Sequence, residues 1–323
     1  MSQSFLTKSI TNFLEEKRAL GYSYKTDEQR LINFDKFIIN KYPETSALTQ
    51  EIIMAWVDRD NVIGSTISRD LTIVNELARF MIRQGSSAAI IPYHKYPRYT
   101  RNFRARILTE SEIQCLLETA DSYPANHVYW DLHHEISCLF HLLVNAGFRI
   151  SELLNMKLNE VNLADAILTV PNGKNQIPRC VPLSDEMANR LREYIEVVHP
   201  AFNEEHLLFP GTRSEKLRAS VVHKYFRNLL RMANIPYCGK SRGPRLHDLR
   251  HTFAVHCLNT WVRNDIDLNT ALPILSKFMG HINIKGTQKY LQFTAEMYPD
   301  LIEKMNTIFG SIIAKGDFEH END

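Results

Sequence analysis

Four side chains that carry positive charge or donate hydrogen bonds lie at positions suited to binding an anion. His247 and Arg250 are three residues apart at the start of an apolar helical pattern, so both lie on one face of its first turn. A helix N-terminus attracts anions because its unpaired backbone N–H groups point outward. Arg149 lies between a glycine that ends one helix and the start of the next, and Lys174 directly follows the turn signal Asn-Gly. Each pattern alone is more typical of an ion-paired or solvent-exposed side chain.

A histidine and a tyrosine further along the chain could add a nucleophile to these cations. His281 follows Met-Gly, and Tyr290 lies nine residues beyond it. A tyrosine hydroxyl has a pKa near 10, so at neutral pH it attacks only with a proton acceptor or in strongly positive surroundings. Tyr290 is one of 13 tyrosines and would alone be read as an ordinary helix residue. Its distance from His281 and the rest of the set singles it out.

In their order along the chain, these segments closely resemble the tyrosine recombinase, or phage integrase, family. The most specific matches are AGFRISELLNMKLNEV, HDLRHTFAVH and FMGHINIKGTQKYLQFT. The resemblance is strong from Arg106 to about Leu301 and loose before that. It implies a site-specific recombinase that cuts and rejoins DNA for integration, excision or transposition. The long segment between Ala254 and Gly280 is more similar to recombinases of transposons and integrative elements, which favours a mobile-element role.

The resemblance also implies which residues are catalytic. They are Arg149, Lys174, His247, Arg250, His281 and Tyr290. Tyr290 would attack the phosphate, with His247 as proton acceptor and His281 as a hydrogen-bonding partner of the transition state. The two arginines suit the charge that develops on the phosphate oxygens, and Lys174 is the candidate acid for the departing 5′-hydroxyl. The product is a 3′-phosphotyrosine, and neither a metal nor a nucleotide cofactor is expected.

Two other function classes stay open, and a metal-dependent nuclease, which EDTA would inhibit, is a weaker third. A topoisomerase would relax any supercoiled DNA by the same tyrosine chemistry, whereas a recombinase should need paired specific sites. A non-enzymatic DNA-binding protein should have lost a catalytic position, and this chain has lost none.

Charge is unevenly distributed, although the formal net charge is only +1. Residues 1–107 carry 16 Lys and Arg against 11 Asp and Glu, so the remaining residues are net negative. The densest basic run is interleaved with aromatic residues and contains Lys95, Arg98, Arg101, Arg104 and Arg106. Such a run suits a DNA backbone, because each bound cation releases condensed counterions. The alternative is a solvated linker.

Composition narrows the class of protein. With 44% hydrophobic and 23% charged residues it is typical of a globular protein, and no apolar run could cross a bilayer. The first residues lack the order of a secretory signal, so we expect a cytoplasmic protein with no membrane partner.

The five cysteines suggest neither a disulfide framework nor a zinc ribbon. His247 and His251 could bind zinc, but no third ligand is evident, and His251 is expected to pack or to contact a phosphate.

Hydrophobic spacing predicts a mainly helical chain with a small β-hairpin, an α+β fold in four parts. Residues 1–88 form a four-helix DNA-binding domain, and residues 89–107 a basic interdomain linker. Residues 108–298 form the catalytic domain, which opens with the capping box Thr109–Glu112 and contains a hairpin between residues 161 and 183. Residues 299–323 form a C-terminal helix and an acidic tail.

The end of the chain bears on assembly. Apolar residues recur there at helical spacing, namely Met297, Leu301, Ile302, Met305, Ile308, Phe309, Ile312 and Ile313. Such a face must dock somewhere, and a terminal helix ordinarily folds back on its own domain. The resemblance instead implies exchange with a neighbouring protomer in a tetramer on double-stranded DNA with specific recombination sites. Accessory proteins are possible partners.

Overall fold

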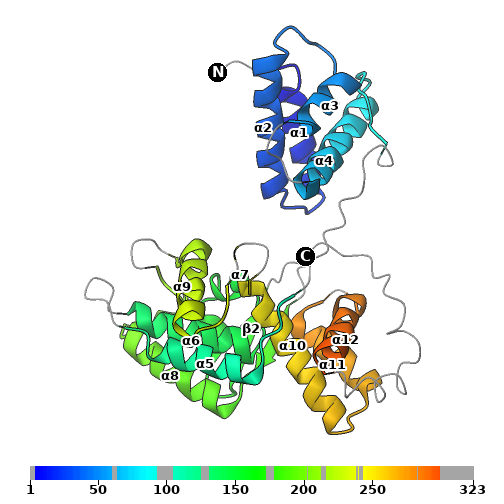
Figure 1. The fold of residues 1–323 in the computed structure, drawn as a ribbon. Helices are drawn as coiled ribbons and strands as arrows, with labels where there is room; N and C mark the ends of the chain where they lie inside the picture. The colour runs from blue at the N-terminus through cyan, green and yellow to red at the C-terminus, as the bar shows by residue number, and fades with distance from the viewer. Residues whose placement is uncertain are drawn as a thin grey trace. The chain divides into compact units, whose positions relative to one another are not determined.

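The computed structural model describes residues 4–59, 64–92, 105–124, 131–171, 178–201, 203–211, 216–237, 239, 243–281 and 283–298. The chain divides into two compact units, Met1–Phe103 and Arg104–Asp323, and each is considered by itself (Figure 1). The described residues are mainly helical with one small antiparallel sheet, so the predicted fold class is confirmed. Among them, no helix is long and apolar enough to span a membrane.

The described part of the first unit contains four helices. They are α1 (Thr7–Ala19), α2 (Lys25–Lys41), α3 (Gln50–Val57) and α4 (Gly64–Arg83). Apolar side chains at helical spacing, such as Phe13, Phe34 and Leu77, form its core. Asp70 on α4 is buried and forms ion pairs with Arg30 and Arg59, which ties α4 to α2 and to the end of α3.

The second unit holds the remaining elements. These are α5 (Glu110–Asp121), α6 (Leu132–Asn145), α7 (Ile150–Leu153), η2 (Leu158–Glu160), β1 (Val161–Asn162), β2 (Ile167–Val170), β3 (Arg179–Pro182), α8 (Asp185–Val198), α9 (Ala219–Met232), α10 (Leu246–Arg263), α11 (Leu268–Met279) and α12 (Lys285–Met297). The predicted capping box is present, since the Thr109 hydroxyl accepts from the Glu112 backbone and the Glu112 carboxylate accepts from the Thr109 backbone. That reciprocal pair satisfies two of the free N–H groups at the start of α5.

The sheet has the strand order β1-β2-β3, and all pairs are antiparallel. β2 and β3 form the predicted hairpin, with Leu168 opposite Val181 and Val170 opposite Arg179. Because side chains alternate across a strand, this register turns both Val181 and Arg179 toward the buried face. β1 is a short third strand that the sequence analysis did not predict. Residues 172–177, which connect β2 to β3 and include Lys174, lie outside the described residues.

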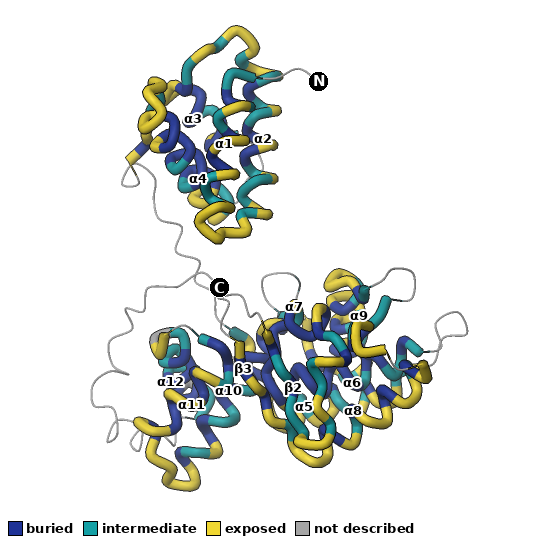
Figure 2. The backbone as a smooth tube through the Cα atoms, turned by 180° about the vertical axis from the view of Figure 1, so that it is seen from behind, coloured by how far each residue is buried: buried dark blue, intermediate teal, exposed yellow. Residues whose placement is uncertain are grey.

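The helix α10 joins two hydrophobic cores of the second unit. Its first turn contributes Leu246 and Leu249 to the core formed with α5, α6, α8, α9 and the sheet. Its later turns contribute Val255 and Leu258 to a second core with α11 and α12. Both views show α10 between α6 and the α11–α12 pair, with buried positions along these contacts (Figures 1 and 2). The start of α10 is therefore held where both cores meet.

Candidate active site

Arg149 is oriented by its own local turn. It precedes α7, and its backbone N–H and its Nη1 donate to the two carboxylate oxygens of Glu152, at 2.9 and 3.0 Å. Two residues earlier, Gly147 has a φ of +58°, and a Cβ there would lie 2.4 Å from the ring of Phe253. Only glycine allows this close approach of the α6–α7 turn to α10. The turn thus brings Arg149 to the N-terminal half of α10.

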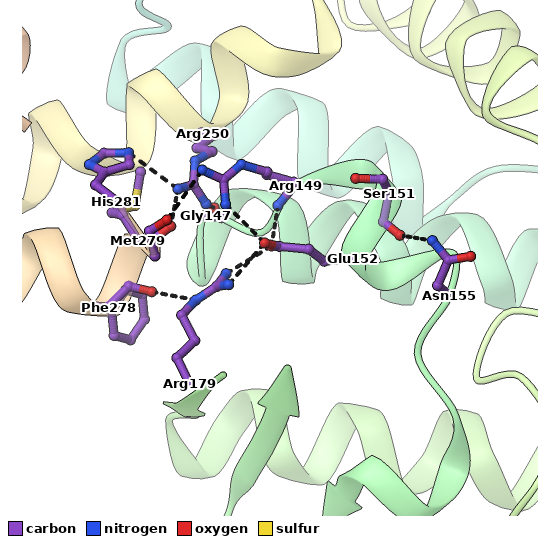
Figure 3. Close-up of polar contacts among 11 residues, drawn as sticks. Gly147, Arg149, Ser151, Glu152, Asn155, Arg179, Arg250, Phe278, Met279 and His281 are labelled. Carbon is purple, nitrogen blue, oxygen red and sulfur yellow. Dashed lines mark hydrogen bonds and ion pairs between the residues drawn. The ribbon is translucent and has the colours of Figure 1, made fainter. Parts of the chain in front are cut away.

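Arg179, the first residue of β3, completes a buried ion cluster that the sequence analysis missed. Its Nη1 and Nη2 donate to both oxygens of Glu152, at 2.9 and 2.8 Å, and its Nε donates to the Phe278 carbonyl at 2.7 Å. Burial would raise the pKa of Glu152, but these hydrogen bonds and positive charges outweigh it and lower that pKa to about 2. Glu152 is therefore an anion shared by two guanidinium groups (Figure 3).

A sequence signal for Arg179 existed but was weak. In Arg179-Cys-Val-Pro the arginine shares a strand face with the buried Val181, which marks an inward-pointing charge. A charge buried that far needs a partner, yet Glu152 is 27 residues away in the sequence. Nothing local connects the two.

Arg250 is 2% exposed and is held by backbone carbonyls. Its Nη1 donates to the Gly147 carbonyl at 2.6 Å, and its Nη2 donates to the Met279 carbonyl. Burial lowers its pKa to about 10, so the guanidinium remains protonated at neutral pH. Figure 3 shows the side chains of Arg149 and Arg250 next to each other, with Glu152 on one side and His281 on the other.

The turn after α11 positions His281. Gly280 ends the helix with a φ of +66°, and its carbonyl accepts from Arg149 Nη2 at 3.4 Å. His281 Nε2 lies 3.4 Å from Arg250 Nη2, and its Nδ1 lies 2.7 Å from the hydroxyl of the buried Thr287. Arginine can only donate, so Nε2 of His281 is the acceptor. Its Nδ1 therefore carries the ring proton and donates it in a hydrogen bond to the Thr287 hydroxyl.

Tyr290 lies on α12 beside two histidines. It is 1% exposed, and its ring stacks on that of His281 with the centroids 6.0 Å apart. Its hydroxyl lies 3.3 Å from Nδ1 of His251. His247, expected to be the proton acceptor, is exposed, and its ring makes an edge contact with the His251 ring at 4.7 Å.

The structure brings together Arg149, Arg250, His281 and Tyr290, with His247 at the edge. Lys174 lies outside the described residues, as do four of the five basic linker residues. The fifth, Arg106, donates from Nη2 to the Glu112 carboxylate at 2.6 Å.

In the described part of the chain, no group of three or more His, Cys, Asp or Glu side chains is arranged to hold a metal ion. Chemically, the site combines fixed cations for an anionic phosphate with a tyrosine hydroxyl and neighbouring imidazoles.

Residues 106–297 match the phage integrase family, and the chain belongs to that family. It is a site-specific tyrosine recombinase, an enzyme that cuts and rejoins DNA.

Related proteins agree with this assignment. The chain is 29% identical over 307 residues to a putative integrase/recombinase, y4rB, of Sinorhizobium fredii, with 94% of this chain and 97% of that protein covered. It is also 29% identical over 209 residues to the tyrosine recombinase XerA of Pyrococcus horikoshii, with 62% and 61% covered.

Solved structures share the fold. A crystal structure of XerA recombinase aligns with a TM-score of 0.50 at 21% identity, covering 94% of this chain and 98% of that one. The Tn1549 transposon integrase in complex with a circular intermediate DNA aligns with a TM-score of 0.63 at 14% identity, covering 93% and 100%.

Proposed function

We propose that this recombinase forms a 3′-phosphotyrosine through Tyr290 within its own catalytic unit. The observation that carries the proposal is the position of the Tyr290 ring, stacked on His281, whose Nε2 contacts the buried Arg250. Nucleophile and cation therefore come from one chain and adjoin one another. A phosphodiester resists attack because of its negative charge, so a tyrosine beside fixed cations is suited to this reaction.

Each neighbouring group has a proposed part in cleavage. Arg149 and Arg250 bind the non-bridging phosphate oxygens as charge builds up on them, because guanidinium groups stay protonated and offer paired donors. Glu152, shared between Arg149 and Arg179, keeps Arg149 in place. Lys174 protonates the departing 5′-oxygen, and His281 supports the transition state through a hydrogen bond. His247 is the proton acceptor that the sequence predicts for Tyr290. The phosphotyrosine keeps the bond energy for rejoining to a second strand.

Burial of the nucleophile links cleavage to assembly in this proposal. Since Tyr290 is 1% exposed, part of what covers its hydroxyl must shift before a DNA phosphate can reach it. Residues 299–323 follow α12 directly, and passing them to a neighbouring protomer would couple that shift to tetramer formation. The related lambda integrase was crystallised as a dimer on a core site, which supports assembly on DNA.

We further propose that the DNA is double-stranded, carries specific sites and belongs to a mobile element, with accessory proteins as possible partners. The likeness to the Tn1549 transposon integrase and the long segment between Ala254 and Gly280 support the mobile-element role. The related XerH was crystallised on its difH substrate, which supports recognition of defined sites. Lys95, Arg98, Arg101, Arg104 and Arg106 would contact the DNA backbone. The enzyme would act in the cytoplasm.

The test is covalent capture. Wild-type protein incubated with the ends of its native genetic element should form adducts that survive denaturation, and Tyr290→Phe should bind the same DNA without forming them. Adducts formed by Tyr290→Phe would move the nucleophile to another residue. Relaxation of any supercoiled plasmid, with no need for paired sites, would favour a topoisomerase instead.

A further inference from the structure

His251 is a buried histidine in contact with the reacting atom, and the mechanism above gives it no role. It follows Arg250 directly on α10, is 3% exposed, and its Nδ1 lies 3.3 Å from the Tyr290 hydroxyl. We propose that His251, in place of His247, accepts the proton that Tyr290 loses as it attacks the phosphate. This inference rests on the proposed role of Tyr290 as the nucleophile.

Packing fixes the direction in which His251 points. Its ring contacts the rings of Tyr290 and Phe293 on α12, at centroid distances of 5.5 and 5.9 Å, and that of His247 one turn earlier on α10. The Tyr290 backbone is held in turn, because the Thr294 hydroxyl donates to its carbonyl at 2.8 Å. A proton acceptor needs hydrogen-bond reach and a fixed orientation, and His251 has both.

The surroundings also keep His251 able to accept. Burial, and then the positive charges of His247, Lys289, Arg250 and Arg245, hold its pKa well below the usual histidine range. These groups come from α10, the residue that precedes it, and α12, which packs against the ring. His251 is therefore neutral at pH 7, and when its proton is on Nε2 the lone pair of Nδ1 faces the hydroxyl.

The proton and bond changes balance within the site. The Tyr290 oxygen bonds to phosphorus as its proton moves to Nδ1 of His251. The bond from phosphorus to the 5′-oxygen breaks, and that oxygen takes a proton from the acid, for which Lys174 is the candidate. During rejoining, a 5′-hydroxyl attacks the phosphotyrosine and gives its proton to the group that acted as acid in cleavage, while His251 returns its proton to the departing tyrosine.

A substrate with sulfur in place of the bridging 5′-oxygen isolates this step. A thiolate leaves without being protonated, so a variant that lacks the acid regains its cleavage rate on that substrate. A variant that lacks the proton acceptor of Tyr290 stays slow. Full-length wild type, His251→Leu and His251→Asn would be compared by single-turnover adduct formation, with melting temperature and DNA binding measured alongside. The asparagine amide can keep a hydrogen bond where Nδ1 lies but cannot take up a proton. His141→Gln is the matched control, since His141 is buried in the same unit but contacts Asp121.

Both His251 variants should be slower than wild type by about a hundredfold or more at pH 7, on the sulfur substrate as well as the natural one. On the sulfur substrate their rates should rise about tenfold per pH unit, because tyrosinate must now form unaided, while wild type stays flat between about pH 6 and 8. The control should match wild type.

Three results would overturn the inference: a wild-type rate for His251→Asn, a faster rate for His251→Leu, or an equal loss at every pH. The first result would mean that His251 only orients Tyr290 by a hydrogen bond. The second would mean that the contact holds Tyr290 back from attack, and the third that His251 only stabilises the fold of the site. If Tyr290→Phe still forms adducts, the proposed function fails first. If Tyr290→Phe is inactive and the His251 variants are normal, only this inference fails.

Discussion

Replacing Glu152 with glutamine should destabilise the catalytic unit by about 3 kcal/mol at neutral pH. The carboxylate is buried and accepts hydrogen bonds from Arg149 and Arg179. Glutamine has nearly the same shape but no charge, so both guanidinium groups would remain buried without their anion.

The magnitude follows from the pKa of Glu152, which is about 2 in the folded chain against an ordinary value of 4.5. Each pKa unit corresponds to about 1.4 kcal/mol, which gives about 3 kcal/mol. Because the folded pKa is the lower one, this stabilisation is complete above about pH 4.5 and is lost as the pH falls through about 2. The gap between wild type and variant should therefore shrink to about 1.4 kcal/mol at pH 3.

Calorimetry of the full chain tests this prediction. For a unit of this size, about 3 kcal/mol corresponds to a fall in melting temperature of about 6–12 °C. Glu196→Gln on α8 is the matched control, because it removes a carboxylate that is exposed. A gap below about 1 kcal/mol at pH 7 would refute the reasoning, since it would mean that the cluster contributes no more than a surface ion pair. A gap that stays constant down to pH 3 would equally refute it.

Three further predictions concern the site, the linker and assembly. Gly280→Ala should destabilise the unit by about 1–2 kcal/mol and slow cleavage, because φ is +66° and the new Cβ would lie 3.0 Å from Arg179 Nη1; unchanged melting and cleavage would show that the turn adapts. Neutralising basic linker residues should weaken binding to all sequences alike and reduce the log–log salt dependence by about 0.9 per lost contact, as measured by titration at several salt concentrations. A changed choice of site would instead mean that the linker reads bases. Deleting residues 299–323 should leave single-site binding largely intact but abolish cooperative synapsis in gel shift and sizing on DNA; full cooperativity would show that protomers join through another surface.

Local features of this protein could be predicted from the sequence because their determinants lie within a few residues. The capping box of α5 involves positions three residues apart, and the β2–β3 hairpin follows from branched residues on either side of a turn signal. The end of α11 is also set locally, because Gly280, the residue before His281, takes the left-handed conformation that closes a helix. The order of motifs along the chain was enough to indicate the family.

Only the tertiary structure decided which side chains meet across these elements. His247 and His251 are one turn apart on the same face of α10, so spacing alone could not tell which of them contacts Tyr290. Packing of α12 against the second turn buries His251 and leaves His247 exposed. Likewise, Glu152 and Arg179 meet only because the β2–β3 register turns Arg179 inward toward α7. Such contacts depend on how distant elements pack, and a buried charge finds its partner there rather than among its neighbours in the sequence.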